Sequence, residues 1–217
     1  MNLAQISAKV RSKAWGKTAA VVGTASVVYR PSGTGNPIVP GNIIASPLIA
    51  IDTSQAFEFN TPQKYGDPTY IAAVDPTNFL IGDYFVNGGS SYFFTNIDAV
   101  APPQVVRCNQ VLTLKRPAPG AAGSSFYGGD TAADETTLAT SWPASVEMGG
   151  RAEKGNTALP QDVRMPGWKI LLPAIPGVQI VTGDVAYDAQ ALPRRYIISA
   201  AELTFMCWRI IALQVGA

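Results

Sequence analysis

The side chains that could do chemistry in this chain are its carboxylates, because histidine is absent from all 217 residues. Without histidine the chain lacks the commonest general base, every His-dependent triad and the commonest zinc ligand. Two carboxylates at a fixed gap can hydrolyse a glycosidic bond, and Asp52 with Glu58 or Glu147 with Glu153 would supply such a pair. Their spacing singles out neither pair, so we assign no catalytic residue and expect a protein that is not an enzyme.

The two cysteines, Cys108 and Cys207, are too few for a zinc knuckle or a disulfide framework. Free cysteine is among the residue types that are most often buried. We therefore interpret both as reduced thiols in a core. We assign no metal-ligating and no cofactor-binding residue, and we expect no cofactor.

Two aspartates recur in the same setting, each behind a glycine that follows an apolar run: Gly82-Asp83 and Gly183-Asp184. At a strand entrance this dipeptide is typical of a turn in which the carboxylate accepts hydrogen bonds from nearby backbone N–H groups. Arg107 and Arg209 recur as well. On barrel strands they would either pair with those aspartates or line a channel, and pairing is the simpler interpretation.

These residues belong to a pattern that occurs twice. Each copy has an apolar run ending in Gly-Asp, then a tyrosine with two large apolar residues, Tyr92 in the first and Tyr196 in the second, and then a strand with arginine. Upstream segments match in the same order: 28–31 with 114–117, 47–52 with 143–147, and 70–72 with 168–170. The offsets run from 86 (Arg30 to Arg116) to 102 (Arg107 to Arg209). A period of this size indicates a duplicated small domain.

Short apolar runs broken by Gly, Pro, Asn and Asp predict β-structure in both copies. The clearest hairpin joins 84–86 to 92–94 through Asn87-Gly88-Gly89, which supplies the positive φ angles of a tight reversal. The segment 30–40 contains Gly33-Thr34-Gly35, but no Gly-Lys-Ser/Thr follows, so we interpret it as a loop. We predict a mainly β fold of two tandem small β-barrel or sandwich units preceded by an N-terminal amphipathic α-helix, because closed sheets protect their edges.

The predicted helix covers about 1–17 and carries charge of one sign. Its apolar residues at helical spacing are Leu3, Ile6, Val10 and Ala14, and its cations are Lys9, Arg11, Lys13 and Lys17. Three interpretations remain open. The cations contact DNA or an anionic lipid surface. The segment has the composition of a transit peptide. Or the cations are the solvated face of a helix that docks on a barrel or a neighbouring chain.

Composition sets the remaining limits. Apolar residues make up 47% and charged residues 14%, which suits a subunit whose faces are covered by neighbours. The net charge of +1 gives no global attraction to nucleic acid, and no apolar run reaches the ~20 residues of a membrane span. We expect no membrane association.

The predicted domains are a basic helix or arm (1–22), a first barrel unit (23–116), a linker or extended loop (117–140) and a second barrel unit (141–217).

One pattern is specific enough to suggest a family. Gly183-Asp184 followed by Arg195-Tyr196-Ile197-Ile198 and a closing strand resembles the small β-barrel head-completion (stopper-like) and tail-joining proteins of tailed bacteriophages. The first unit has the same frame in Gly82-Asp83 and Tyr92-Phe93-Phe94. The chain departs from a single-barrel stopper in being doubled and in its basic N-terminal helix.

The resemblance implies a structural virion protein: a ring-forming subunit of the head-tail connector, or neck, that joins portal to tail around the DNA channel. Its partners would be further copies of itself, the portal and tail proteins, and packaged DNA through nonspecific contact. The helix would then contact the portal or DNA through Lys9, Arg11, Lys13 and Lys17. Its location would be the neck or tail of the virion, and the host cytoplasm during assembly.

The alternative is a tail-associated carbohydrate- or receptor-binding β module, which needs exposed aromatic residues such as Trp142 or Trp168, although we expect these in a core. A hydrolase is the third possibility.

Overall fold

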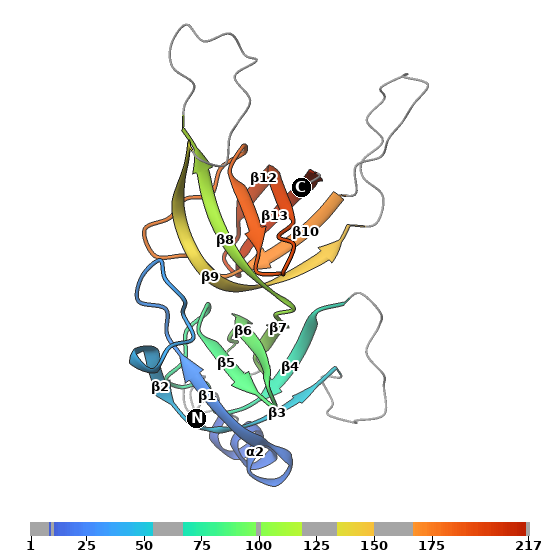
Figure 1. Cartoon of the computed structure of the whole chain (residues 1–217). Helices are drawn as coiled ribbons and strands as arrows, with labels where there is room; N and C mark the ends of the chain where they lie inside the picture. The colour runs from blue at the N-terminus through green and yellow to red at the C-terminus, as the bar shows by residue number, and fades with distance from the viewer. Residues whose placement is uncertain are drawn as a thin grey trace, which may run out of the picture.

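The computed structural model describes residues 9, 11–53, 67–98, 101–118, 134–149 and 167–215. The chain forms two closed antiparallel barrels behind a short helix, and the second barrel lies above the first in Figure 1. The predicted fold class is therefore confirmed. In the described part of the chain, no helix combines the length and the apolar character that crossing a bilayer requires.

The N-terminal helix extends further than predicted. A π-helical turn, η1 (Arg11–Trp15), leads into α2 (Gly16–Val22), which continues beyond Lys17 until the extended backbone of Gly23 ends it. Its contact with the first barrel is made by Ala19, which is buried, whereas Ala14 of the predicted apolar face is exposed. The other members of that face, Leu3, Ile6 and Val10, lie outside the described residues.

The first barrel is a closed ring of six strands with a short seventh, β2, beside it. Its strands are β1 (Thr24–Tyr29), β2 (Ile43–Ala45), β3 (Leu48–Asp52), β4 (Thr69–Ala73), β5 (Tyr84–Asn87), β6 (Ser90–Asn96) and β7 (Gln104–Arg107). The order around the barrel is β1-β3-β4-β7-β6-β5, with β5 pairing back to β1 and the short β2 also on β1. The interior is filled by residues such as Val28, Ile49, Phe85 and Phe94. The predicted hairpin is present, with Gly88 and Gly89 both at positive φ between the paired Asn87 and Ser90.

The second barrel repeats this plan. Its strands are β8 (Gln110–Pro117), β9 (Glu135–Met148), β10 (Gly167–Leu172), β11 (Val185–Asp188), β12 (Arg195–Leu203) and β13 (Trp208–Val215). The order β8-β9-β10-β13-β12-β11 is that of the first barrel, with β9 in the place of β2 and β3 together. Residues such as Leu114, Ile170, Tyr196 and Ile198 fill its interior.

The register of the paired strands aligns the two barrels residue by residue. Tyr92 pairs with Phe85 across β5 and β6, and Tyr196 pairs with Ala186 across β11 and β12. Tyr70 pairs with Val105 in the first barrel as Trp168 pairs with Ala212 in the second. The two barrels therefore share a strand order and an alignment of inward-facing positions, as expected for a duplicated unit.

The predicted boundary between the units, after residue 116, is wrong. The end of the predicted first unit contains two strands, β7 and β8 (Gln110–Pro117), and β8 opens the second barrel. The chain changes direction at Asn109, whose side chain donates to Val146 O and accepts from Val146 N, both at 2.8 Å. Because a contact with a residue distant in the sequence separates β7 from β8, neither Gly nor Pro marks the boundary between these strands. The predicted linker 117–140 overlaps two paired strands of the second barrel, since it includes the last residue of β8 and the first six of β9, 135–140, and 119–133 lies outside the described residues.

The two barrels meet through an apolar wall of the first. Tyr84, Phe93 and Val106 alternate with the inward residues of β5, β6 and β7, so they point outward, yet they are almost fully buried. They join the core of the second barrel, where Tyr84 lies edge-on to Trp142. Burying a ring of this size contributes about 4–6 kcal/mol before entropic costs, from roughly 150–250 Å² at about 25 cal/mol per Å².

Hydrogen bonds fix this joint. Tyr84 Oη donates to Pro143 O at 2.7 Å. Thr34 O, in the predicted loop 30–40, accepts from Thr140 N and from Trp142 Nε1, both at 2.9 Å. A β-bulge next to Ser141, at φ 57°, breaks the β8–β9 register beside Thr140. The loop of one barrel therefore satisfies backbone and side-chain donors of the other.

The chain between α2 and β1 requires glycine, and we predict that Gly23→Ala lowers the free energy of unfolding by about 1–3 kcal/mol. A methyl group there would overlap Ala19 O and lie 3.1 Å from Ile49 N, and both are backbone atoms. Gly41→Ala is the matched control, since its methyl would point into open space. Urea denaturation followed by circular dichroism measures both, and equal stability of the two variants would contradict the prediction.

Candidate functional site

An arginine holds the Gly-Asp turn in the first barrel. The Arg30 guanidinium donates to both carboxylate oxygens of Asp83, at 3.0 Å from Nε and 2.7 Å from Nη2, and Nη2 also donates to Asn78 O at 2.9 Å. Asp83 Oδ2 accepts from Leu80 N at 2.8 Å. Gly82 supplies the left-handed turn at φ 93° and donates its N–H to the neighbouring β6. We call this the first Arg–Asp pair.

The second barrel contains the same arrangement. Arg116 donates to both oxygens of Asp184, at 2.7 Å from Nε and 2.9 Å from Nη2, and to Gln179 O at 2.7 Å. Asp184 Oδ2 accepts from Val181 N at 2.9 Å, and Gly183 again has φ 93°. This second Arg–Asp pair matches the first contact for contact.

Both pairs tie the loop that crosses from β4 to β5, or from β10 to β11, to the end of the barrel's first strand. The carboxylates are almost fully buried, while the arginines remain partly exposed. The hydrogen bonds that Arg30 and Arg116 donate to Asp83 and Asp184 raise the pKa values of both arginines above the ordinary value. The predicted turn chemistry of the aspartates is confirmed, and the arrangement is structural: a bidentate ion pair that fixes a loop.

The predicted partners of the aspartates, Arg107 and Arg209, are wrong. Arg107 Nη2 contacts Ser90 Oγ at 3.3 Å, and Arg209 pairs at 2.9 Å with Glu202 in an exposed ion pair. Nor are the two arginines equivalent to each other. Arg107 pairs with Tyr92, whereas the residue paired with Tyr196 is Gln214. Strand β13 is longer than β7, so matching the arginines by type shifted the alignment. The sequence did contain a signal for the true partners, Arg30 and Arg116, because both lie in the matched segments 28–31 and 114–117.

The repeated tyrosines occupy equivalent places inside the barrels. Tyr92 meets Tyr70 edge-on with ring centroids 5.9 Å apart, and Tyr196 meets Trp168 edge-on at 5.7 Å. Burial raises the pKa of both phenols, that of Tyr196 to about 12. Both therefore stay neutral at physiological pH and act as packing residues.

A charged cluster without a counterpart in the sequence predictions lies beside Tyr196. Asp188 is buried and accepts from Arg194 Nε at 2.6 Å, from Arg194 N at 2.9 Å and from Tyr196 Oη at 3.2 Å. The Arg194 guanidinium in turn covers the faces of Trp168 and Tyr196. Burial opposes ionisation of Asp188, but the hydrogen bonds and charge of Arg194 outweigh it, and the pKa of Asp188 is lowered.

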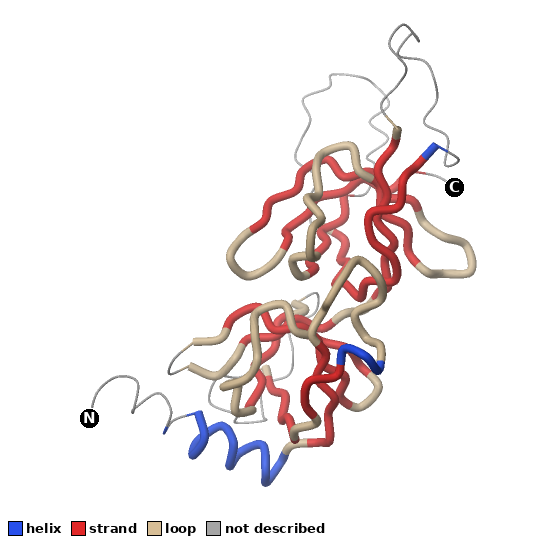
Figure 2. Tube along the Cα trace, turned by 90° about the vertical axis from the view of Figure 1, so that its left-hand side faces the viewer, coloured by secondary structure: helices blue, strands red, loops and turns tan. Residues whose placement is uncertain are grey.

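The four cations predicted to contact DNA or the portal lie on the N-terminal helix. Lys9, Lys13 and Lys17 are exposed, and the side chain of Arg11 lies outside the described part. Figure 2 shows this helix at the end of the first barrel that faces away from the second. The exposed lysines are therefore available to a partner at one extremity of the molecule.

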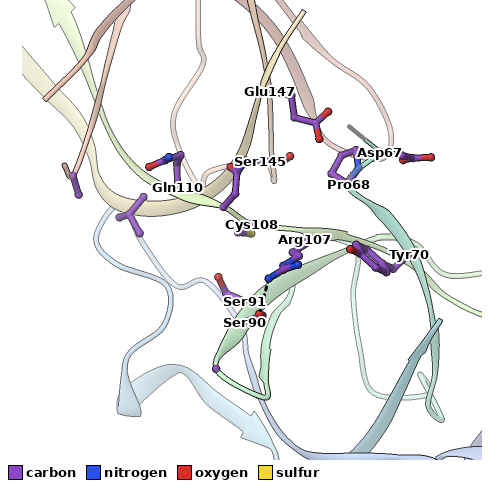
Figure 3. A pocket seen from close by; sticks show the side chains of 14 residues that line it. Asp67, Pro68, Tyr70, Ser90, Ser91, Arg107, Cys108, Gln110, Ser145 and Glu147 are labelled. Carbon is purple, nitrogen blue, oxygen red and sulfur yellow. Dashed lines mark hydrogen bonds between the residues drawn. The ribbon is translucent and has the colours of Figure 1, made fainter. Parts of the chain in front are cut away.

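A cleft of about 870 Å³ lies between the barrels (Figure 3). Its walls include Arg107, Ser90, Cys108, Ser145 and Glu147. Among the described residues nothing hydrogen-bonds to the buried Ser145 Oγ. Burial is the main cause that raises the pKa of Glu147, and burial likewise raises that of Cys108, which keeps the thiol protonated and poorly nucleophilic. The polar side chains of this cleft can hydrogen-bond to a polar chain segment.

Both cysteines are free and buried, as predicted. The carboxylate pairs considered for glycoside hydrolysis cannot be compared, because Glu58 and Glu153 lie outside the described residues. Where the structure describes the chain, no three His, Cys, Asp or Glu side chains gather as a metal site would require. The tryptophans considered for carbohydrate binding are packed, Trp142 fully and Trp168 against Tyr196 and beneath Arg194.

No protein-family model, no curated protein and no solved structure matches this chain. The likeness that defines it is internal, between two barrels that share a strand order, a left-handed Gly-Asp turn and a bidentate ion pair. The same hydrogen bonds build these features in each half.

Because the two Arg–Asp pairs make the same contacts, Asp83→Asn and Asp184→Asn should be about equally destabilising. We expect each to lower the free energy of unfolding by about 1–3 kcal/mol, since an amide cannot accept the same set of bonds in a buried site. Glu202→Gln is the control, because its ion pair is exposed and should change stability by less than about 0.5 kcal/mol. Urea denaturation measures the free energy of unfolding of each variant. A loss of stability in Asp184→Asn without one in Asp83→Asn would refute the equivalence.

The lowered pKa of Asp188 predicts a loss of stability in acid. Its folded pKa lies below the unfolded value of about 3.9, so its contribution is complete above that pH and disappears as the pH falls through the folded pKa. Asp188→Asn should reduce stability at pH 7 and flatten the dependence between about pH 5 and pH 3. Thermal melts across that range test this, and an unchanged slope in the variant would contradict it.

Proposed function

We propose that this chain is a structural subunit of the head-tail connector of a tailed bacteriophage, which forms a ring between portal and tail around the DNA channel. The observation that carries the proposal is the recurring Gly-Asp and tyrosine frame. The residues on which the resemblance rests build the same buried Arg–Asp pair and aromatic packing in two small barrels. This is the kind of unit that the resemblance implies, present twice in one chain.

The way the barrels are joined supports a mechanical role between other subunits. Closed sheets keep their backbone donors and acceptors paired internally, so contacts with neighbours fall to outer faces and loops. The joint combines an apolar wall with hydrogen bonds across the units, which makes the pair one body. Two barrels in one chain would allow a ring to keep its circumference with half as many subunits.

The helix supplies the contact with portal or DNA. Lys9, Lys13 and Lys17 are exposed at the far end of the first barrel. Lysines on such an arm would contact DNA phosphates without reading sequence, and this contact would weaken as salt increases. Copies of the chain, the portal and tail proteins and packaged DNA are thus the proposed partners, in the virion neck or tail and, during assembly, in the host cytoplasm.

Mass spectrometry of purified virions tests the proposal most directly. We expect peptides of this chain at a fixed ratio to the portal protein, and negative-stain electron microscopy of the purified protein should show rings. A lone binding module would appear as single particles and would give signals on a glycan array. Absence of the chain from virions of the phage that encodes it would refute the proposal.

A further inference from the structure

Two polar side chains of β9 line the cleft between the barrels from the same face of the strand. They are Ser145 and Glu147, which lie two residues apart. Val146 between them belongs to the core of the second barrel, so the alternation of a strand places its two neighbours together on the outer face. Side chains on one face of a strand repeat roughly every 7 Å. Figure 3 shows both residues on the wall that the second barrel forms.

Neither group has a hydrogen-bond partner within the described part of the chain. Ser145 is 1% exposed, and its Oγ is unpaired there. The carboxylate of the half-buried Glu147 makes no hydrogen bond or ion pair with any described residue, although Lys169 lies across from it on β10. A buried polar group without a partner is costly, so a bound molecule that supplies the missing hydrogen bonds would gain affinity from them.

The wall formed by the first barrel contributes a cation. Arg107, at the end of β7, is exposed, and Nη2 is the one guanidinium nitrogen with a partner in the described chain, Ser90 Oγ at 3.3 Å. Arg107 and Glu147 both line the cleft, yet no ion pair joins them among the described residues. Figure 3 shows the two opposite charges on different barrels, so a ligand between them could contact both.

These groups favour a ligand that carries charges of both signs. A cation would pair with Glu147, where the negative charge of Asp67 adds to the attraction, and an anion would pair with Arg107. A phosphate would be repelled by the two carboxylates. A neutral sugar would leave the charges unpaired, and the one aromatic ring among the described lining residues, Tyr70, is half-buried against Tyr92. An extended polypeptide can present basic and acidic side chains on one face, roughly 7 Å apart.

We propose that the cleft binds an extended polar segment of another polypeptide. A lysine or arginine of that segment pairs with Glu147, an aspartate or glutamate pairs with Arg107, and Ser145 Oγ hydrogen-bonds to its backbone. The cleft volume of about 870 Å³ lies within the range of roughly 300–1,000 Å³ that is common for ligand sites. The inference goes beyond the proposed function, because the cleft would bind such a segment whether or not the chain is part of a connector.

The test uses the full chain and an array of short peptides, blocked at both ends, in which each position is varied in turn. We expect the labelled chain to prefer a basic residue at one position and an acidic residue at another. Isothermal titration calorimetry then measures the affinity for the preferred peptide. No binding at about 1 mM peptide, or binding that ignores the charge of the peptide, would overturn the inference.

Two variants assign each charge of the peptide to its partner. Glu147→Gln should remove the preference for the basic residue alone, and Arg107→Gln the preference for the acidic residue alone. Each should weaken binding roughly 10-fold, because a charge-assisted hydrogen bond is lost. Glu202→Gln and Arg209→Gln are the matched controls, since neither is among the described residues that line the cleft, and both should bind like wild type. Cleft variants that keep both preferences would contradict the assignment.

Ser145→Ala separates a binding role from a structural one. Loss of a buried hydroxyl that has no partner should leave the midpoint of urea denaturation unchanged or raise it. The same change should weaken peptide binding roughly 5-fold, because the hydrogen bond to the peptide backbone is lost. A lower midpoint with unchanged affinity would make the hydroxyl structural and would overturn its part in the proposal.

Hydrogen exchange of the wild-type chain locates the peptide without any variant. Bound peptide should slow exchange of the amides in 89–91 and 107–111, which border the cleft, and leave those in 203–206, between β12 and β13, unchanged. Protection outside the cleft alone would overturn the inference. A glycan-array signal that both Glu147→Gln and Arg107→Gln abolish would overturn it in favour of a sugar site.

Discussion

The structure depends on the burial of an apolar outer wall of the first barrel under the open end of the second. Outward residues of a small barrel normally face water, but Tyr84, Phe93 and Val106 belong to the core of the neighbouring unit. Removing those rings from water is the main favourable term, and the hydrogen bonds of Tyr84 and Thr34 give it direction. Without this contact, the second barrel would expose its interior at one end.

The two barrels are closed in the same way, each by what precedes it in the chain. Helix α2 runs directly into β1 and covers the end of the first barrel, and β7 runs directly into β8 and brings the first barrel onto the end of the second. A glycine makes the first of these entries and Asn109 the second. In the second unit, the first barrel therefore has the place that α2 has in the first unit.

Charge is concentrated in a few buried pairs. Asp83, Asp184 and Asp188 are each enclosed by an arginine and a backbone donor, so their ion pairs and hydrogen bonds hold particular loops in place. Elsewhere the sequence has long uncharged stretches, and the one from Thr18 to Ile51 contains Arg30 alone. A chain with 14% charged residues that uses several of them internally has little left to keep its faces apart from other protein surfaces.

The sequence by itself determined the class of fold, the duplication, the Gly88-Gly89 hairpin and the turn role of the two aspartates. These follow from local rules: strand periodicity, positive φ at glycine, and a carboxylate beside its own backbone. Only the tertiary structure decided which arginines meet those aspartates, where the first barrel ends, and that Tyr84 faces the other barrel. Each of these depends on segments distant in the chain, and a sequence pattern records which residues can pair but not which of them the closed barrel brings together.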